Sequence, residues 1–99
     1  MSYVVVIART AHEQFRKLDA RRRSALKQAM RAHLESAPVR ESKSRIKRLK
    51  GLRQPQYRLR VDDVRVFYDV NEAEKRVEVL GFVKKPETHR WLQDHGVPE

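Results

Sequence analysis

The sequence predicts an α+β fold: an N-terminal strand, a hairpin of two helices, and then a three-stranded antiparallel run with the helices packed on one face. Three features favour this class. The chain begins with a short β-branched segment, continues with apolar residues at helical spacing, and then alternates apolar and polar residues. Because helices and strands come in separate runs, they are expected to form separate layers. The 99 residues suit a single domain over residues 1–99.

The first third of the chain is expected to hold the first strand and the helical hairpin. Residues 3–7 are apolar and mostly β-branched, which predicts a strand. A first helix is expected over residues 11–18, and a second one from Asp19, a candidate N-cap, to about residue 36. The apolar face of the second helix is formed by residues spaced by four: Leu26, Met30 and Leu34.

The rest of the chain is expected to be a loop followed by strands. Gly51 and Pro55 interrupt residues 39–55, so this segment predicts a loop with a short strand near residues 46–50. Three strands with period-two alternation should follow, over residues 56–61, 64–70 and 76–83. We expect a flexible tail over residues 86–99, with room for one helical turn.

The net charge points to a polyanionic or acidic partner. Lys and Arg number 23 against 13 Asp and Glu, which gives +10 with neutral histidines. Residues 40–60 hold nine cations and Glu41 as the one acid, and blocks of one sign commonly mark a binding surface. The alternative is a solvated surface that keeps the protein soluble. The loop residues expected to contact such a partner, and to bind RNA phosphates if the family resemblance described below holds, are Lys43, Arg45, Lys47, Arg48, Lys50 and Arg53.

Composition excludes several other classes of protein. The chain has no cysteine, which removes disulfides and thiolate catalysis. Its longest apolar runs are far shorter than the roughly 20 residues that span a bilayer. We expect no membrane segment, no leader and a cytoplasmic protein. His12, His33 and His95 lack the spacing of metal ligands, so neither a metal nor a cofactor is expected.

The alternating segments place several arginines on one face of a hairpin. If residues 62–63 form a two-residue turn, Arg60 lies opposite Arg65 and Arg58 lies opposite Phe67. Opposed like charges destabilise a sheet, so a phosphate-binding site explains the pattern better than folding does. The Phe67 ring could then stack on a base. A solvated face whose arginines pair with nearby acids, or a different register, remain alternatives. Turn chemistry explains the two aspartates better than acid–base catalysis.

The same residues carry a family resemblance. Residues 56–68 resemble the core signature of the RelE/ParE toxin superfamily: an aromatic residue, alternating basic and apolar residues, a polar turn, then arginine, two apolar residues and tyrosine. The resemblance extends from residue 3 to about residue 91. For the RelE branch it implies metal-independent cleavage of mRNA in the ribosomal A site, by attack of a 2′-hydroxyl on the adjacent phosphate. For the ParE branch it implies a poison of DNA gyrase on the same scaffold.

The resemblance also suggests roles for individual residues. Arg58, Arg60 and Arg65 match basic residues that would bind the scissile phosphate and stabilise its charge in the transition state. Relatives often have lysine on the first of these strands. Arginine cannot readily give up its proton, so the general base is open. A module that binds RNA or the ribosome without catalysis is therefore a further alternative.

The residues after the last strand complete the implied site. Lys84 and Lys85 stand where the family has another basic residue, and Trp91 stands where it has an aromatic residue that stacks on a base. Trp91 replaces a common tyrosine and could equally pack the tail. Lys85 and His89 are the candidates for proton transfer.

A type II toxin implies protein and RNA partners. The expected protein partner is a RelB-like antitoxin, an acidic or amphipathic segment that covers the basic surface in a hetero-oligomer. The expected targets are the ribosome and its mRNA.

Overall fold

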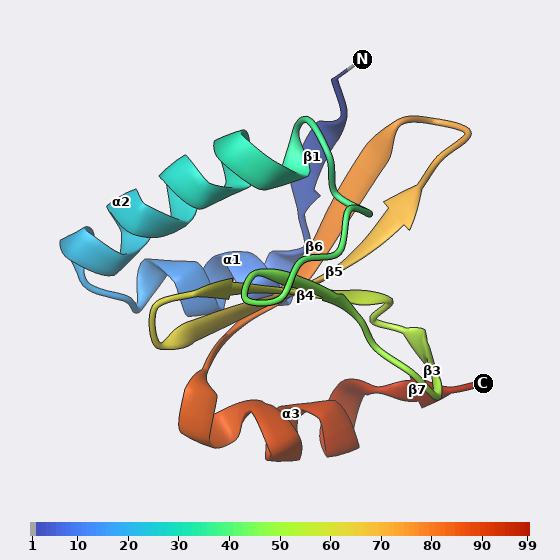
Figure 1. Cartoon of the computed structure of the whole chain (residues 1–99). Coiled ribbons are helices and arrows are strands. Elements are labelled where there is room, and N and C mark those ends of the chain that lie inside the picture. Colours follow the sequence, from blue (N-terminus) through green and yellow to red (C-terminus); the bar gives the residue numbers. More distant parts are fainter. Residues whose placement is uncertain (1) are drawn as a thin grey trace.

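The α+β class is confirmed in a computed structural model, which describes residues 2–99 (Figure 1). One strand is followed by two helices, a run of strands, a third helix and a short final strand. The elements of the first half are β1 (Val4–Ile7), α1 (Arg9–Arg16), α2 (Ala20–Ala29) and η1 (Met30–Leu34). Those of the second half are β2 (Ile46–Arg48), β3 (Leu52–Gln54), β4 (Tyr57–Val61), β5 (Val64–Asn71), β6 (Arg76–Lys84), η2 (Lys85–Glu87), α3 (Thr88–His95) and β7 (Val97–Pro98).

The main sheet has five strands in the order β1-β6-β5-β4-β2. The predicted antiparallel run forms its centre, because β5 pairs with β4 on one side and with β6 on the other. The first strand joins this run in parallel with β6, so that Val5 lies beside Val77. The short strand predicted near residues 46–50 forms as β2 and extends the sheet beyond β4. A separate two-stranded sheet joins β3 to β7.

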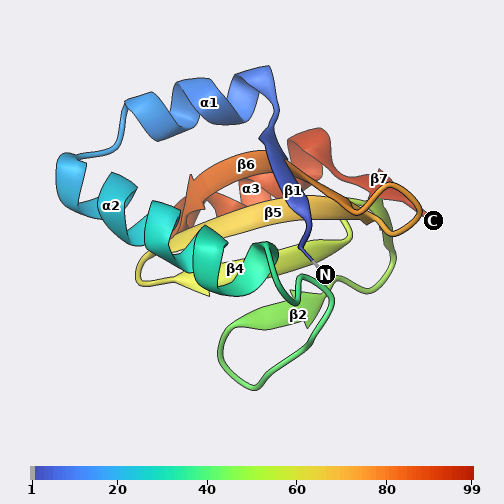
Figure 2. The same ribbon diagram turned by 90° about the horizontal axis from the view of Figure 1, so that it is seen from above.

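The helical hairpin packs on one face of this sheet (Figure 2). Asp19 is the N-cap of α2, as predicted, and its side chain accepts the backbone N–H of Arg22 at 3.0 Å. The first helix begins at Arg9, two residues earlier than expected. The second continues from α2 into a π-helical turn, which ends at Leu34.

The core lies between these helices and the sheet. Leu26, Met30 and Leu34 are buried, as their spacing predicted. They face the apolar side of the β4–β5 hairpin, which contributes Leu59, Val61, Val64, Val66 and Tyr68. Full burial of a leucine or valine side chain contributes about 1.5–3 kcal/mol, so this layer holds the hairpin in register. The Tyr68 hydroxyl, buried within it, donates to the Pro38 carbonyl at 2.7 Å.

The tail forms more regular structure than the one helical turn expected. After η2, α3 crosses the sheet face opposite α1 and α2, and β7 then pairs with β3 (Figures 1 and 2). The sheet is therefore covered on both faces over part of its area. No helix within residues 2–99 is long and apolar enough to cross a membrane.

Candidate nucleic-acid interface

The β4–β5 hairpin has the predicted register. Arg58 lies beside Phe67, Arg60 beside Arg65, and Val61 beside Val64. Asp62, the first turn residue, has a φ of 53°, a left-handed conformation that aspartate tolerates better than most residues. The hairpin therefore places its arginines on the face opposite the α1–α2 layer, as the alternation required.

A fourth cation joins these arginines from the neighbouring strand. In the β2–β4 pairing Lys47 lies beside Arg58, and cross-strand neighbours share a face of the sheet. We call the resulting cluster the arginine face; it consists of Lys47, Arg58, Arg60 and Arg65. Within residues 2–99, none of the four forms a salt bridge.

The arginines differ in how much of each is accessible. Arg65 is only 6% exposed, and its Nη1 donates to the Asp62 carbonyl at 2.9 Å. Arg58 is half-buried, and its buried Nε has no hydrogen-bond partner in the described part of the chain. Arg60 is exposed. Arg65 is thus fixed by a hydrogen bond, Arg58 has an unused donor, and Arg60 is open to solvent.

Electrostatics also favours an anion at this face. Burial lowers the pKa of Arg65, and the positive charges of Arg58 and Arg60 lower it further. Asp69, one of the acids that could have paired with the arginines, is already occupied. Its two oxygens accept the Gln54 amide at 2.7 Å and the Gln56 backbone N–H at 2.8 Å. An incoming phosphate would relieve this uncompensated repulsion and could accept several charge-assisted hydrogen bonds.

The two aromatic residues expected to stack on bases stack on each other instead. The ring centroids of Phe67 and Trp91 are 4.9 Å apart and their planes are inclined by 8°. Phe67 is 1% exposed, so the expectation that its ring is open to a base is wrong for this conformation. The His95 ring lies 4.9 Å from the Trp91 ring as well. Trp91 therefore packs the tail, which was the other role considered for it.

The candidate site residues at and after the end of β6 lie at different places on the protein. Lys84 pairs with Val64 and so lies on the helix side of the sheet, away from the arginine face. Lys85 is exposed, and its backbone N–H donates to the Asp63 carbonyl at 2.8 Å, beside the hairpin turn. His89 is exposed on α3, about 200° around the helix from Trp91, which contacts the sheet. The structure does not bring His89 to the arginines.

The cations of the basic block, residues 40–60, likewise lie on different surfaces of the protein. Arg48 lies beside Tyr57, on the helix side, where its guanidinium covers the tyrosine ring at 5.4 Å. The same group donates to the Gln56 carbonyl at 2.8 Å, so Arg48 is engaged internally. Arg45 lies close enough to His33 to help burial lower the pKa of that imidazole. The remaining cations of the block are exposed on loops and on β3: Arg40, Lys43, Lys50 and Arg53.

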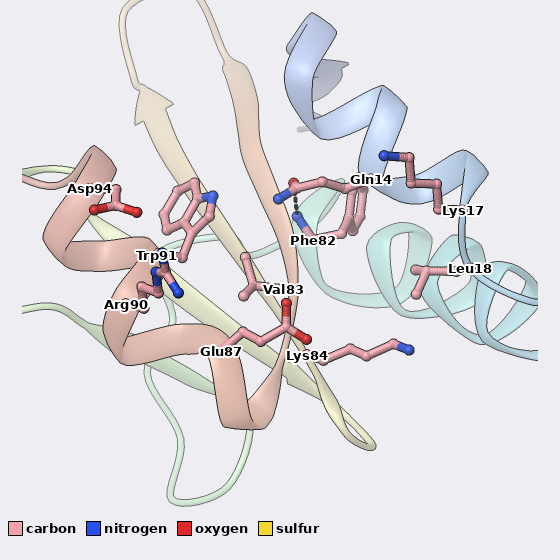
Figure 3. A pocket seen from close by; sticks show the side chains of 10 residues that line it. All are labelled: Gln14, Lys17, Leu18, Phe82, Val83, Lys84, Glu87, Arg90, Trp91 and Asp94. Atoms are coloured by element: carbon pink, nitrogen blue, oxygen red, sulfur yellow. Dashed lines mark hydrogen bonds between the residues drawn. The ribbon is translucent and has the colours of Figure 1, made fainter.

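A groove that the sequence did not reveal opens beside β6. It has a volume of about 470 Å³ and lies between the end of α1, the last residues of β6, and α3 (Figure 3). The pairing with β1 stops at Val79, and beyond it the Gln14 side chain accepts the Phe82 backbone N–H at 2.9 Å. Lys17, Lys84 and Trp91 are among its lining residues. Its walls come from three distant segments, which is why no local pattern signalled it.

An ion pair between the helices and the hairpin turn likewise has no local signal in the sequence. Arg22 binds Asp63 through two parallel hydrogen bonds, Nε to Oδ1 at 2.9 Å and Nη2 to Oδ2 at 2.6 Å. The pair holds the pKa of the Asp63 carboxyl below its ordinary value, chiefly through the hydrogen bonds from Arg22. The residues are separated by 41 positions, so only the tertiary fold brings them together.

Comparisons with known proteins fit this fold. Residues 5–85 match the family described as the ParE toxin of the type II toxin–antitoxin system parDE. A chain of the archaeal RelE–RelB complex from Pyrococcus horikoshii is 28% identical; the match covers 86% of this chain and 97% of that one, with a TM-score of 0.70. A mutant of the E. coli toxin RelE in the free state is 23% identical over 92% of each chain, with a TM-score of 0.71.

A chain of the Mycobacterium tuberculosis toxin–antitoxin complex RelBE2 is similar at 23% identity; the match covers 85% of this chain and 99% of that one, with a TM-score of 0.67. A search of curated proteins found no match. Because the family match spans most of the sequence, the chain belongs to the ParE toxin family of type II toxin–antitoxin systems, within the RelE/ParE toxin superfamily.

Proposed function

We propose that this toxin is an endoribonuclease that cleaves mRNA in the ribosomal A site and so inhibits translation. The observation that carries the proposal is the arginine face. It gathers four cations on one side of the sheet, and none of them is neutralised by a carboxylate within residues 2–99. Clusters of this kind suit the binding of phosphate groups.

The main requirement of the proposed cleavage reaction is stabilisation of negative charge on the phosphate. The 2′-oxygen forms a bond to the adjacent phosphorus while the bond from phosphorus to the 5′-oxygen breaks. The 2′-hydroxyl gives up its proton, the departing 5′-oxygen takes one from water, and the products are a cyclic phosphate and a 5′-hydroxyl. Negative charge builds on the phosphate oxygens in between. Arg65, held by the Asp62 carbonyl and only 6% exposed, would act on that charge through its own positive charge, and the exposed Arg60 beside it would make the direct contact. Arg58 offers a buried Nε that has no other acceptor within the described residues.

Proton transfer has a single remaining candidate among the side chains considered. Arginine keeps its proton at neutral pH, and His89 points away from the arginines. Lys85 follows β6 directly, and its backbone is tied to the hairpin turn next to Arg65. We assign Lys85 as the candidate for proton transfer in this reaction.

The proposed partner is a RelB-type antitoxin. The similar structures from P. horikoshii and M. tuberculosis are toxin–antitoxin complexes. The net charge of +10 would attract an acidic or amphipathic segment of the antitoxin. This segment would cover the arginine face in the cytoplasm until the toxin is released. The same charge suits contacts with ribosomal RNA, whose strength should depend on salt.

A gyrase poison is the second candidate, because the family that matches residues 5–85 is named for ParE. The packing of Trp91 on Phe67 also removes the base platform that a RelE-like site would be expected to use. Against this reading, poisoning gyrase would not require an unpaired arginine cluster on the sheet.

The experiment is to induce this chain alone in cells and to map the 5′ ends of mRNA. The test variant is Arg60→Gln, because Arg60 is exposed and its loss should not disturb folding; the matched control is Arg31→Gln, an exposed arginine on η1. New cuts inside translated codons, lost in Arg60→Gln and kept in Arg31→Gln, would support the nuclease. Growth arrest with DNA damage and no cuts would move the assignment to the gyrase poison. Ribosome binding without cuts would leave a binding module.

A further inference from the structure

The turn between β4 and β5 is attached to the helical layer by the pair of Arg22 and Asp63. The guanidinium meets the carboxylate as a fork, with donor–acceptor distances of 2.9 and 2.6 Å. Arg22 is itself oriented, because its Nη1 lies 3.3 Å from an oxygen of Asp19, the cap residue of α2. A bidentate contact of this kind fixes direction as well as distance.

The same turn also holds two parts of the proposed site. The Asp62 carbonyl accepts Arg65 Nη1 at 2.9 Å, and the Asp63 carbonyl accepts the Lys85 N–H at 2.8 Å. A shift of the turn would therefore move the buried Arg65 and the proton-transfer candidate Lys85 together. No other salt bridge within residues 2–99 links the helical layer to this hairpin.

We propose that Arg22 and Asp63 are positioning residues for the arginine face: their ion pair fixes the turn whose carbonyls hold Arg65 and the backbone of Lys85. This inference rests on the proposed nuclease function. The pair also occupies the Asp63 carboxylate. Without Arg22, the Asp63 carboxylate would be unpaired next to the cations of the arginine face. It would then compete with the substrate phosphate for these cations.

The exposure of the pair argues that its role is local rather than a source of global stability. The side chains of Arg22 and Asp63 are 36% and 47% exposed, and ion pairs that reach solvent contribute little to the stability of a fold. A positioning role predicts that activity falls much more than stability when the pair is broken.

The test compares two variants, Arg22→Gln and Asp63→Asn, with two matched controls. Arg21→Gln removes the exposed neighbouring cation, and Glu13→Gln breaks an exposed ion pair of 3.2 Å with Arg16 on α1. Misplacement of reacting groups by about 1 Å can cost roughly 100-fold, so we expect kcat for mRNA cleavage on ribosomes to fall about 10- to 100-fold in both test variants. KM should change by less than about threefold in Asp63→Asn and should rise in Arg22→Gln, where the freed carboxylate competes with the substrate, and the controls should match the wild type.

A second readout does not depend on activity. Amide hydrogen exchange at Lys85 should accelerate in Arg22→Gln and Asp63→Asn, because its acceptor carbonyl is released, and stay unchanged in both controls. Adding Asp63→Asn to Arg22→Gln should bring KM back toward the wild-type value, since it removes the competing carboxylate, and should leave kcat low, since the turn remains free. Unchanged kcat and exchange in both test variants would overturn the inference. A wild-type chain that makes no cuts would instead overturn the proposed function, and with it the catalytic part of this inference.

Discussion

Trp91 lies flat on Phe67, and the contact depends on a residue that has no side chain. A Cβ added at Gly81 would lie 2.6 Å from the Trp91 ring, closer than side chains can approach. Glycine at this position of β6 therefore lets α3 settle against the sheet, in the manner of strand glycines that admit a close neighbour. The tail is held by this contact at one end and by the β3–β7 pairing at the other.

Gly81→Ala should displace Trp91 and loosen α3. The added methyl group overpacks the contact, so the free energy of unfolding should fall by about 1–3 kcal/mol. Trp91 is the sole tryptophan, and its fluorescence should shift to longer wavelength as the ring becomes more exposed to water. Urea titration followed by fluorescence measures both effects. Unchanged emission and midpoint would contradict the packing role given to Gly81.

Arg58→Gln should lower the activity of the protein without lowering its stability. The variant removes a buried Nε that has no partner and relieves repulsion of Arg65, so the free energy of unfolding should stay the same or rise slightly. Removal of one preorganised donor typically lowers kcat by about 100- to 1,000-fold, and we expect a loss of that order for mRNA cleavage. Kinetics on programmed ribosomes and thermal unfolding test the two parts. A strongly destabilised variant would point to a structural role instead.

Salt dependence should distinguish cations that contact RNA from those engaged within the protein. Each lost phosphate contact reduces the slope of log K against log salt by about 0.7–0.9. Lys47→Gln should show this reduction for binding to ribosomes that carry mRNA. Arg48→Gln, whose guanidinium bonds the Gln56 carbonyl, should leave the slope unchanged. Equal slopes for the two variants would argue against a division of the basic block between two surfaces.

Mild acid should destabilise the fold through His33. Burial, assisted by Arg45, lowers the pKa of His33 below its ordinary value of 6.5. The unfolded chain then binds the proton more readily than the folded one, so stability is retained above that value and lost as the pH falls below it. The urea midpoint should drop more between pH 7.5 and 5.5 in the wild type than in His33→Gln. His12→Gln, at an exposed site on α1, should behave like the wild type.

Local periodicity predicted those features that depend on neighbours in sequence. The register of β4 against β5 follows from a two-residue turn and period-two alternation, and it placed Arg60 beside Arg65 correctly. The buried positions of α2 followed from their spacing in the same way.

The features that were missed depend on contacts between distant segments. Residues 88–95 offer few apolar side chains, and their helix is held by the site that Gly81 opens on β6. The pairing of Arg22 with Asp63 required both the hairpin turn and α2 to be in place. Lys47 and Arg48 lie on opposite faces, as neighbours in any strand do, but which of them joins the arginines could be assigned only once β2 was paired with β4.

The parallel pairing of β1 with β6 has a consequence for how the toxin is made. β1 finds its partner only after the helices and the β4–β5 hairpin have been synthesised. Until then Leu26 and Leu34 on the early helices have no completed sheet to pack against, and contacts so distant in sequence form slowly. The layer that packs the helices against the sheet is therefore completed late, once β6 has joined β1 to the β4–β5 hairpin.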